Sequence, residues 1–98
     1  MIEAPDEVIH QSTRLRITAA LNVLRKGESL EFGEIKKMLG ITDGNMATHL
    51  NALEGAGYVA VQKDFVGKKP RTRIALTAAG RKAFAAHVSY LRELLETG

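Results

Sequence analysis

The chain has 98 residues and a formal net charge of +3 at pH 7, which predicts a single domain covering residues 1–98. Its 45% hydrophobic and 26% charged content is typical of a globular protein. The absence of cysteine excludes disulfides and cysteine metal sites. No apolar run approaches the roughly 18 residues that span a membrane. The acidic first residues lack the apolar core of a secretion signal, so we expect a cytoplasmic protein with no membrane partner.

Two helices are expected in the first part of the chain. Ser12 is the predicted N-cap of the first, whose apolar face repeats Ile17 and Leu21 at helical spacing and which should end near Gly27. A short extended link over residues 29–32 leads to a second helix of about two turns. Its predicted inward residues are Ile35, Met38 and Leu39. Gly40 is suited to end it in the left-handed conformation.

A third helix follows a tight turn. Thr42 is suited to cap it, Met46, Leu50 and Leu53 form its apolar stripe, and Gly57 is suited to end it. Two helices joined by a tight glycine-containing turn form the helix-turn-helix pattern. The third helix carries no lysine or arginine. On spacing alone, a core helix with an ordinary solvated face explains it as well as a helix that reads a partner.

After Gly57 the apolar period changes from about 3.6 residues to 2. Residues 58–66 and 71–77 are predicted strands, with Val59, Val61, Ile74 and Leu76 facing inward and residues 67–70 as the turn. A last helix should run from about residue 78 to 96. The fold class is therefore mainly α with a small β-hairpin (α+β), in the order helix-helix-helix-strand-strand-helix, which is a winged helix-turn-helix.

Positive charge is concentrated in the hairpin. Five basic residues face one acidic residue there, which gives a local net charge of +4. The basic residues are Lys63, Lys68, Lys69, Arg71 and Arg73. A charged loop that only aids solubility is the alternative, but five cations on one hairpin favour an anionic partner such as nucleic acid.

The combination of these segments resembles the winged helix-turn-helix transcriptional regulators of the MarR/ArsR type, in particular the small single-domain winged helix DNA-binding group. The resemblance is carried by residues 14–17, 39–59, 67–77 and 76–80 and covers about residues 10–95. It implies that the third helix is a recognition helix, that the hairpin is a DNA-binding wing carrying the five basic residues above, and that terminal helices form a dimer. The recognition positions that it implies are Thr42, Asp43, Gly44, Asn45, Thr48, His49 and Asn51.

The residue types at these positions suit DNA. Asparagine can pair with adenine through two hydrogen bonds, and threonine serves several bases. Asp43 opposes phosphate binding at the helix start, so it either stabilises the helix or accepts from a cytosine amine. This chain has Asn51-Ala52 where related sequences often carry a basic pair. Phosphate contacts from the wing would supply affinity and position.

The last helix carries more apolar residues than one small domain covers. Ala83, Tyr90 and Leu94 form a stripe beside a second one. An uncovered apolar stripe usually marks an interface, so we expect a homodimer. The predicted interface residues are Phe84, Val88, Leu91 and Leu95. The alternative is that all of them join the core of the monomer.

Other functions find less support. The three histidines fall in separate predicted elements without ligand spacing, so no metal or cofactor is expected. No nucleophile elbow or glycine-rich phosphate loop is present, so we expect no enzyme. No residue set identifies a site for a small-molecule effector. The sequence predicts a sequence-specific regulator that binds double-stranded DNA; the alternative is a winged helix used as a protein-interaction or assembly module.

Overall fold

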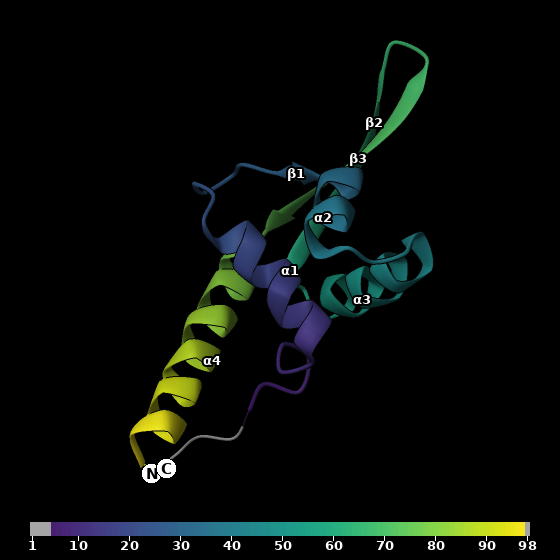
Figure 1. Cartoon of the computed structure of the whole chain (residues 1–98). Helices are drawn as coiled ribbons and strands as arrows, with labels where there is room; N and C mark the ends of the chain where they lie inside the picture. The colour runs from purple at the N-terminus through teal and green to yellow at the C-terminus, as the bar shows by residue number, and fades with distance from the viewer. Residues whose placement is uncertain (1–4, 98) are drawn as a thin grey trace.

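The structure is a computed structural model that describes residues 5–97, so the extreme ends of the predicted domain lie outside it. It contains four helices and a three-stranded antiparallel sheet with strand order β1-β3-β2 (Figure 1). The elements are α1 (Ser12–Asn22), β1 (Leu30–Glu31), α2 (Phe32–Leu39), α3 (Asp43–Gly55), β2 (Val59–Val66), β3 (Lys69–Leu76) and α4 (Ala78–Thr97). The α+β winged helix fold is confirmed.

The core is formed between the first three helices and the base of the hairpin. Its buried residues are Ile17, Leu21, Ile35, Met46, Leu50, Leu53, Val59, Ile74 and Leu76. The predicted inward face of α3 is confirmed. The prediction for Met38 is wrong, because this side chain is 60% exposed. At about 100° per residue, Met38 and Leu39 flank Ile35 on opposite sides, and α2 buries the Leu39 flank.

Both predicted ends of α1 need correction. Gln11 rather than Ser12 is the N-cap, and its side-chain oxygen accepts from the Arg14 backbone N–H at 2.9 Å. The helix ends at Asn22, before Gly27. The Arg81 guanidinium of α4 donates to the carbonyls of Asn22 at 3.1 Å and Leu24 at 3.3 Å. These bonds satisfy carbonyls that a longer helix would otherwise have paired.

The sheet also differs from the prediction in two places. The predicted extended link contains β1, which pairs with β3 through Leu30–Ile74 and Glu31–Arg73. The hairpin turn is shorter than predicted, because Val66 already pairs with Lys69. Only residues 67 and 68 remain in the turn, and Gly67 has a φ of 64° there, as in a type II′ turn.

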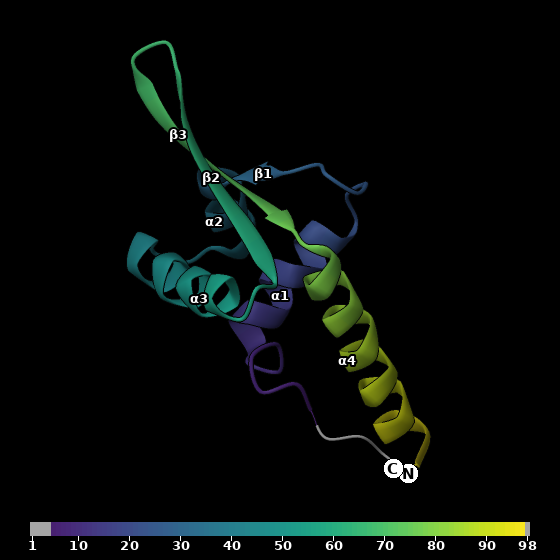
Figure 2. The same ribbon diagram turned by 180° about the vertical axis from the view of Figure 1, so that it is seen from behind.

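A compact joint connects the end of α3 to the start of α4. Gly57, with a φ of 79°, and Tyr58 donate to the carbonyls of Glu54 and Leu53 and close α3 in a Schellman motif. Thr77 then donates its backbone N–H to the Tyr58 carbonyl at 3.0 Å and its hydroxyl to the Gly57 carbonyl at 2.6 Å. The α4 helix therefore starts directly on the turn that ends α3 (Figure 2).

Gly80 allows this joint to close. A Cβ at Gly80 would collide with the Tyr58 carbonyl oxygen and lie 2.8 Å from Leu76 Cδ1. Thr77 caps the start of α4, because its hydroxyl accepts from the Gly80 backbone N–H at 2.9 Å. Residues 76–80, which contribute to the family resemblance, thus set how α4 packs against the rest of the molecule.

Candidate nucleic-acid interface

The predicted recognition positions lie on the open side of α3. Six of the seven are exposed, and His49 is half-buried. The Thr42 hydroxyl accepts from the Asn45 backbone N–H at 3.2 Å, which confirms the predicted cap. The Thr48 hydroxyl donates to the Gly44 carbonyl at 2.9 Å. Because that hydrogen is engaged, Thr48 presents its methyl group and oxygen lone pairs to a partner.

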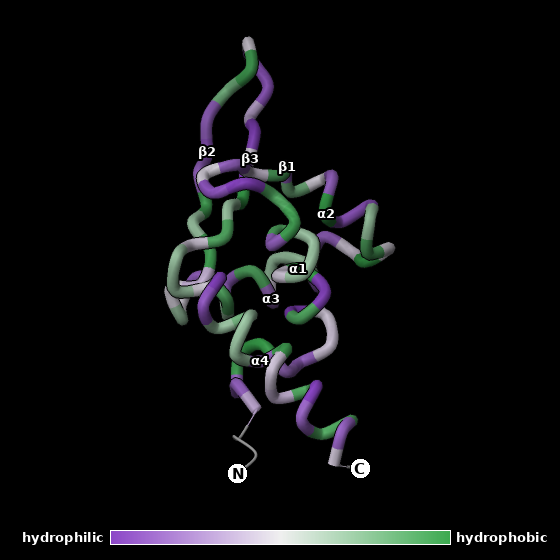
Figure 3. Tube along the Cα trace, turned by 90° about the vertical axis from the view of Figure 1, so that its left-hand side faces the viewer, coloured by the Kyte–Doolittle hydropathy of each residue, from purple (hydrophilic) through white to green (hydrophobic). Residues whose placement is uncertain are grey.

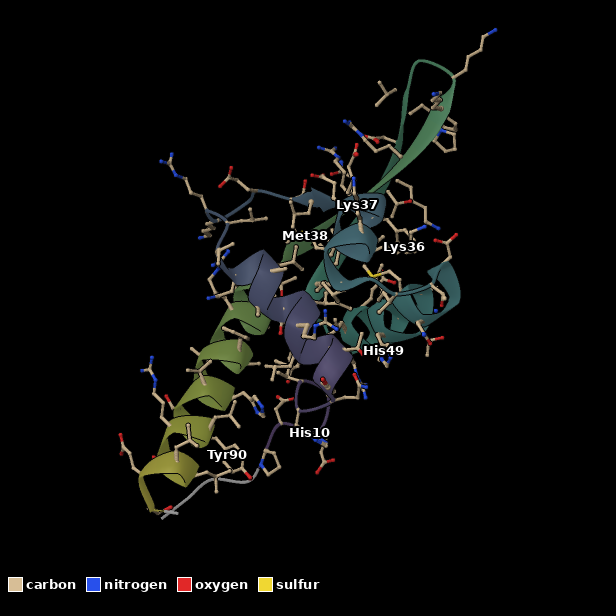
Figure 4. The ribbon with its side chains drawn as sticks, viewed as in Figure 1. His10, Lys36, Lys37, Met38, His49 and Tyr90 are labelled. Carbon is tan, nitrogen blue, oxygen red and sulfur yellow. The ribbon has the colours of Figure 1, made fainter. Side chains whose placement is uncertain are left out.

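Asp43 is not a free negative charge. Its carboxylate oxygen Oδ1 forms an ion pair with Lys36 Nζ at a distance of 2.7 Å. Lys36 lies in the last turn of α2 (Figure 4). Such an exposed pair adds little stability. It nevertheless reduces the negative potential at the start of α3, and it favours the first of the two predicted roles of Asp43, stabilisation of the helix start. Sequence reasoning missed Lys36. The available signal was a lysine in the last turn of α2, which only a short turn separates from the start of α3.

The predicted basic residues of the wing fall into two groups. Asp64 Oδ1 accepts from Arg71 Nε at 2.9 Å, and its Oδ2 accepts from Arg71 at 2.8 Å and from Arg73 at 3.0 Å. The Arg71 hydrogen bonds, with the charge of both guanidinium groups, hold the pKa of Asp64 below its usual range. Three exposed lysines remain outside this cluster, and they are Lys63, Lys68 and Lys69. The +4 of the hairpin is therefore carried mainly by these lysines.

A groove of about 930 Å³ separates α3 from the wing. Ala47, Leu50 and Asn51 line its helical side, while Val61, Lys63 and Lys69 line its hairpin side. Glu54 and Glu31 also line it, but Glu31 is occupied in the capping box at the start of α2. Asn51 thus lies on the same concave surface as two of the wing lysines, whereas the other six recognition positions are not part of the groove lining.

The predicted interface residues of α4 are partly covered. Phe84, Val88 and Leu91 are half-buried, whereas Leu95 is 84% exposed and the neighbouring Leu94 is 39% exposed. The two halves of α4 therefore differ: its first half packs against the domain, and its last turns present leucines to solvent.

His87 is the side chain of α4 that sequence reasoning missed. It is 3% exposed, and burial lowers its pKa. Nearby, the Tyr58 hydroxyl donates to Asp6 at 2.8 Å. Burial raises the pKa of Asp6, but hydrogen bonds from the Ile9 backbone, Tyr58 and the Val8 backbone outweigh it and lower the pKa overall. A residue pattern offered no signal for His87, because a histidine on an amphipathic helix is ordinarily placed outside.

Within residues 5–97, no group of three histidine or acidic side chains is placed to hold a metal ion. Across the same described range, no helix is long and apolar enough to cross a membrane.

The chain resembles known proteins over almost its whole length. Residues 13–95 match the family described as "Winged helix DNA-binding domain". An uncharacterised protein of Methanocaldococcus jannaschii is 34% identical over 90 residues, which cover 92% of this chain and 91% of that protein. The structure of a transcriptional regulator homologue from Pyrococcus horikoshii superimposes with a TM-score of 0.84 at 27% identity, covering 94% of this chain and 88% of that one.

MepR of S. aureus in complex with DNA shares the fold. It has a TM-score of 0.70 at 23% identity, with 89% of this chain and 61% of MepR covered. The predicted resemblance to winged helix transcriptional regulators is confirmed, and the chain belongs to the family of winged helix DNA-binding domains.

Proposed function

We propose that this regulator binds double-stranded DNA sequence-specifically as a homodimer, with α3 in the major groove and the wing lysines on the phosphate backbone. The observation that carries the proposal is the shared groove, which places Asn51 of α3 on one surface with Lys63 and Lys69 of the hairpin. On a duplex, base edges likewise lie beside phosphates, so an amide and neighbouring cations on one surface can contact both. Membership of a DNA-binding family supports a role other than catalysis.

The chemistry of α3 favours A·T-rich half-sites. Guanine is most often read by arginine or lysine, and α3 has neither. Asn45 and Asn51 are exposed amides that match the donor and acceptor of adenine. The methyl groups of Ala47 and Thr48 suit the thymine methyl. Asp43, which could otherwise accept from cytosine, is engaged with Lys36.

The exposed end of α4 supports a dimer. Leu94 and Leu95 leave apolar surface open on the last turns of the helix, and a two-fold axis there would cover it. Such a dimer would read half-sites about 34 Å apart, one turn of DNA. NadR, which shares the fold at 21% identity, was solved with 4-hydroxyphenylacetate. A small-molecule effector of this chain would bind between helices or at the dimer interface.

Selection of bound duplexes from a random DNA pool tests the proposal. We expect enrichment of A·T-rich half-sites repeated in two-fold symmetry about 10 base pairs apart. If three lysines per protomer reach phosphates, the logarithm of the binding constant should fall with the logarithm of salt concentration with a slope of about −5. Light scattering should report a dimer.

Failure to enrich any sequence would contradict specific recognition. A salt-independent affinity, or no binding, would instead favour the protein-interaction module, since fold does not fix function. A monomer at micromolar concentration would contradict the proposed dimer. The proposed DNA contacts of α3 and the wing would then be tested by the binding data alone.

A further inference from the structure

The tip of the wing, defined as residues 65–70, carries apolar side chains in solvent. Phe65 is 70% exposed and Val66 is 57% exposed. Pro70, which pairs with Phe65 across the hairpin, is also exposed. Phe32 and Phe84, the other phenylalanines, are half-buried. Successive side chains of a strand point to opposite faces, so Phe65 and its partner Pro70 lie on one face of the hairpin and Val66 lies on the other. These three residues, called the tip cluster, therefore give the end of the hairpin exposed apolar side chains on both faces.

The cluster sits on a stiff support that extends away from the body. A two-residue turn closes the hairpin, and Val66 pairs directly with Lys69. Just below the tip, Asp64 holds Arg71 and Arg73 together. The tip points away from the helices, and hydrophobic and hydrophilic residues alternate along it (Figures 1 and 3). Its apolar residues therefore reach a partner before the body does.

The charge around the tip identifies the kind of partner. Lys63, Lys68 and Lys69 are exposed near the cluster. Asp64, the one acidic residue of the hairpin, is already neutralised by two arginines. A surface that is apolar at its end and cationic at its sides matches a partner with an anionic exterior and an apolar interior. Duplex DNA has this construction, with phosphates outside and stacked bases inside.

We propose that the wing tip inserts Phe65 and Val66 as a wedge into the minor groove, partly unstacks one base step and bends the operator. The inference rests on the proposed function, because α3 must lie in the neighbouring major groove. The strand axes of a hairpin are about 4.8 Å apart before the width of the backbone and side chains is added, so only the end of the hairpin can enter a minor groove about 6 Å wide. Apolar wedges of this kind kink DNA by about 20–90°. A·T-rich sites contain TA steps, which unstack easily.

A bending assay on the operator from the selection experiment tests the wedge. Fluorescent dyes at the two ends of a 30-base-pair duplex would report bending as increased energy transfer, and 2-aminopurine beside the half-site would report unstacking as increased fluorescence. We expect both signals on adding wild-type protein. The double variant Phe65→Ala with Val66→Ala should bind but leave both signals near those of free DNA. Phe65→Leu, which keeps an apolar wedge, should retain the bend.

Val23→Ala is the matched control. Val23 is the C-cap residue of α1 and is 83% exposed. Its replacement removes exposed apolar surface outside the hairpin, so bending should be unchanged. Binding of the wild-type protein without bending or unstacking would overturn the wedge while leaving the proposed function intact. Absence of any DNA binding would overturn both. Phe65-dependent binding to anionic vesicles, with no DNA bend, would assign the tip to a membrane surface instead and overturn the wedge.

Discussion

The α3 helix and the wing line the same groove but are built in opposite ways. The α3 helix is held along its length by Met46, Leu50 and Leu53 in the core and exposes uncharged amide and hydroxyl groups. The wing is anchored only at its base, and its outer half carries lysines beside apolar residues. Uncharged amide and hydroxyl groups on a rigid helix suit recognition of base edges, whereas cationic side chains suit phosphates. Specificity and affinity should therefore be separable by mutation.

The largest effect should come from removing the amides of α3. In Asn45→Ala with Asn51→Ala, each lost contact costs about 1–3 kcal/mol, so affinity for the selected duplex should fall to the non-specific level, on the order of 1,000-fold. Fluorescence anisotropy with selected and scrambled duplexes measures the ratio. The salt slope should stay the same. Asn22→Ala, which removes an amide from α1, is the control. A loss that affects both duplexes equally would contradict the assignment.

Neutralising the wing should have the complementary effect. Lys68→Gln with Lys69→Gln should weaken binding to selected and scrambled duplexes alike, on the order of 100-fold at 0.1 M salt, and reduce the salt slope of a dimer by about 4. Titrations at several salt concentrations provide the test. Lys26→Gln with Lys82→Gln removes the same charge from a surface next to the start of α4. If the two pairs behave alike, net charge rather than the wing accounts for affinity.

A variant at the joint should affect both regions together. Gly80→Ala places a methyl group against the Tyr58 carbonyl, at the residue where α3 leads into β2. Overpacking of this kind costs roughly 1–3 kcal/mol, so denaturant unfolding should show a lower midpoint, while the folded fraction keeps its DNA specificity. Gly55→Ala, the same change at a helical glycine whose Cβ would meet nothing within 4 Å, is the control and should not lower the midpoint. An unchanged midpoint would show that the joint is not tightly packed.

The smallest effect should come from releasing the two wing arginines. Asp64→Asn removes the carboxylate that holds Arg71 and Arg73. Because both become available to phosphates, affinity for any duplex should rise severalfold and the salt slope should steepen by about 1 per freed arginine, with stability almost unchanged. Glu96→Gln makes the same charge change on α4. Weaker binding of Asp64→Asn would mean that the ion pairs hold the wing in its binding conformation.

Local patterns predicted the fold well and the site less well. Apolar spacing and capping residues identified the four helices and the hairpin, since these depend on neighbours in the chain. The pairing of Lys36 with Asp43 and of Asp64 with two arginines depends on which elements lie side by side, so counting charges along the sequence overestimated the free cations of the wing. Met38 was misplaced because two turns of helix define an apolar face poorly. Burial of His87 follows from tertiary packing alone.

The Gly57–Thr77 joint has a mechanical consequence for the proposed dimer. Because α4 begins on the backbone that ends α3, the two helices should move as one lever rather than as hinged parts. A small change in the angle between the α4 helices of the two protomers would then change the distance between their two α3 helices. Since operator spacing tolerates little error, an event at the far end of α4 could release DNA without altering any residue that touches it.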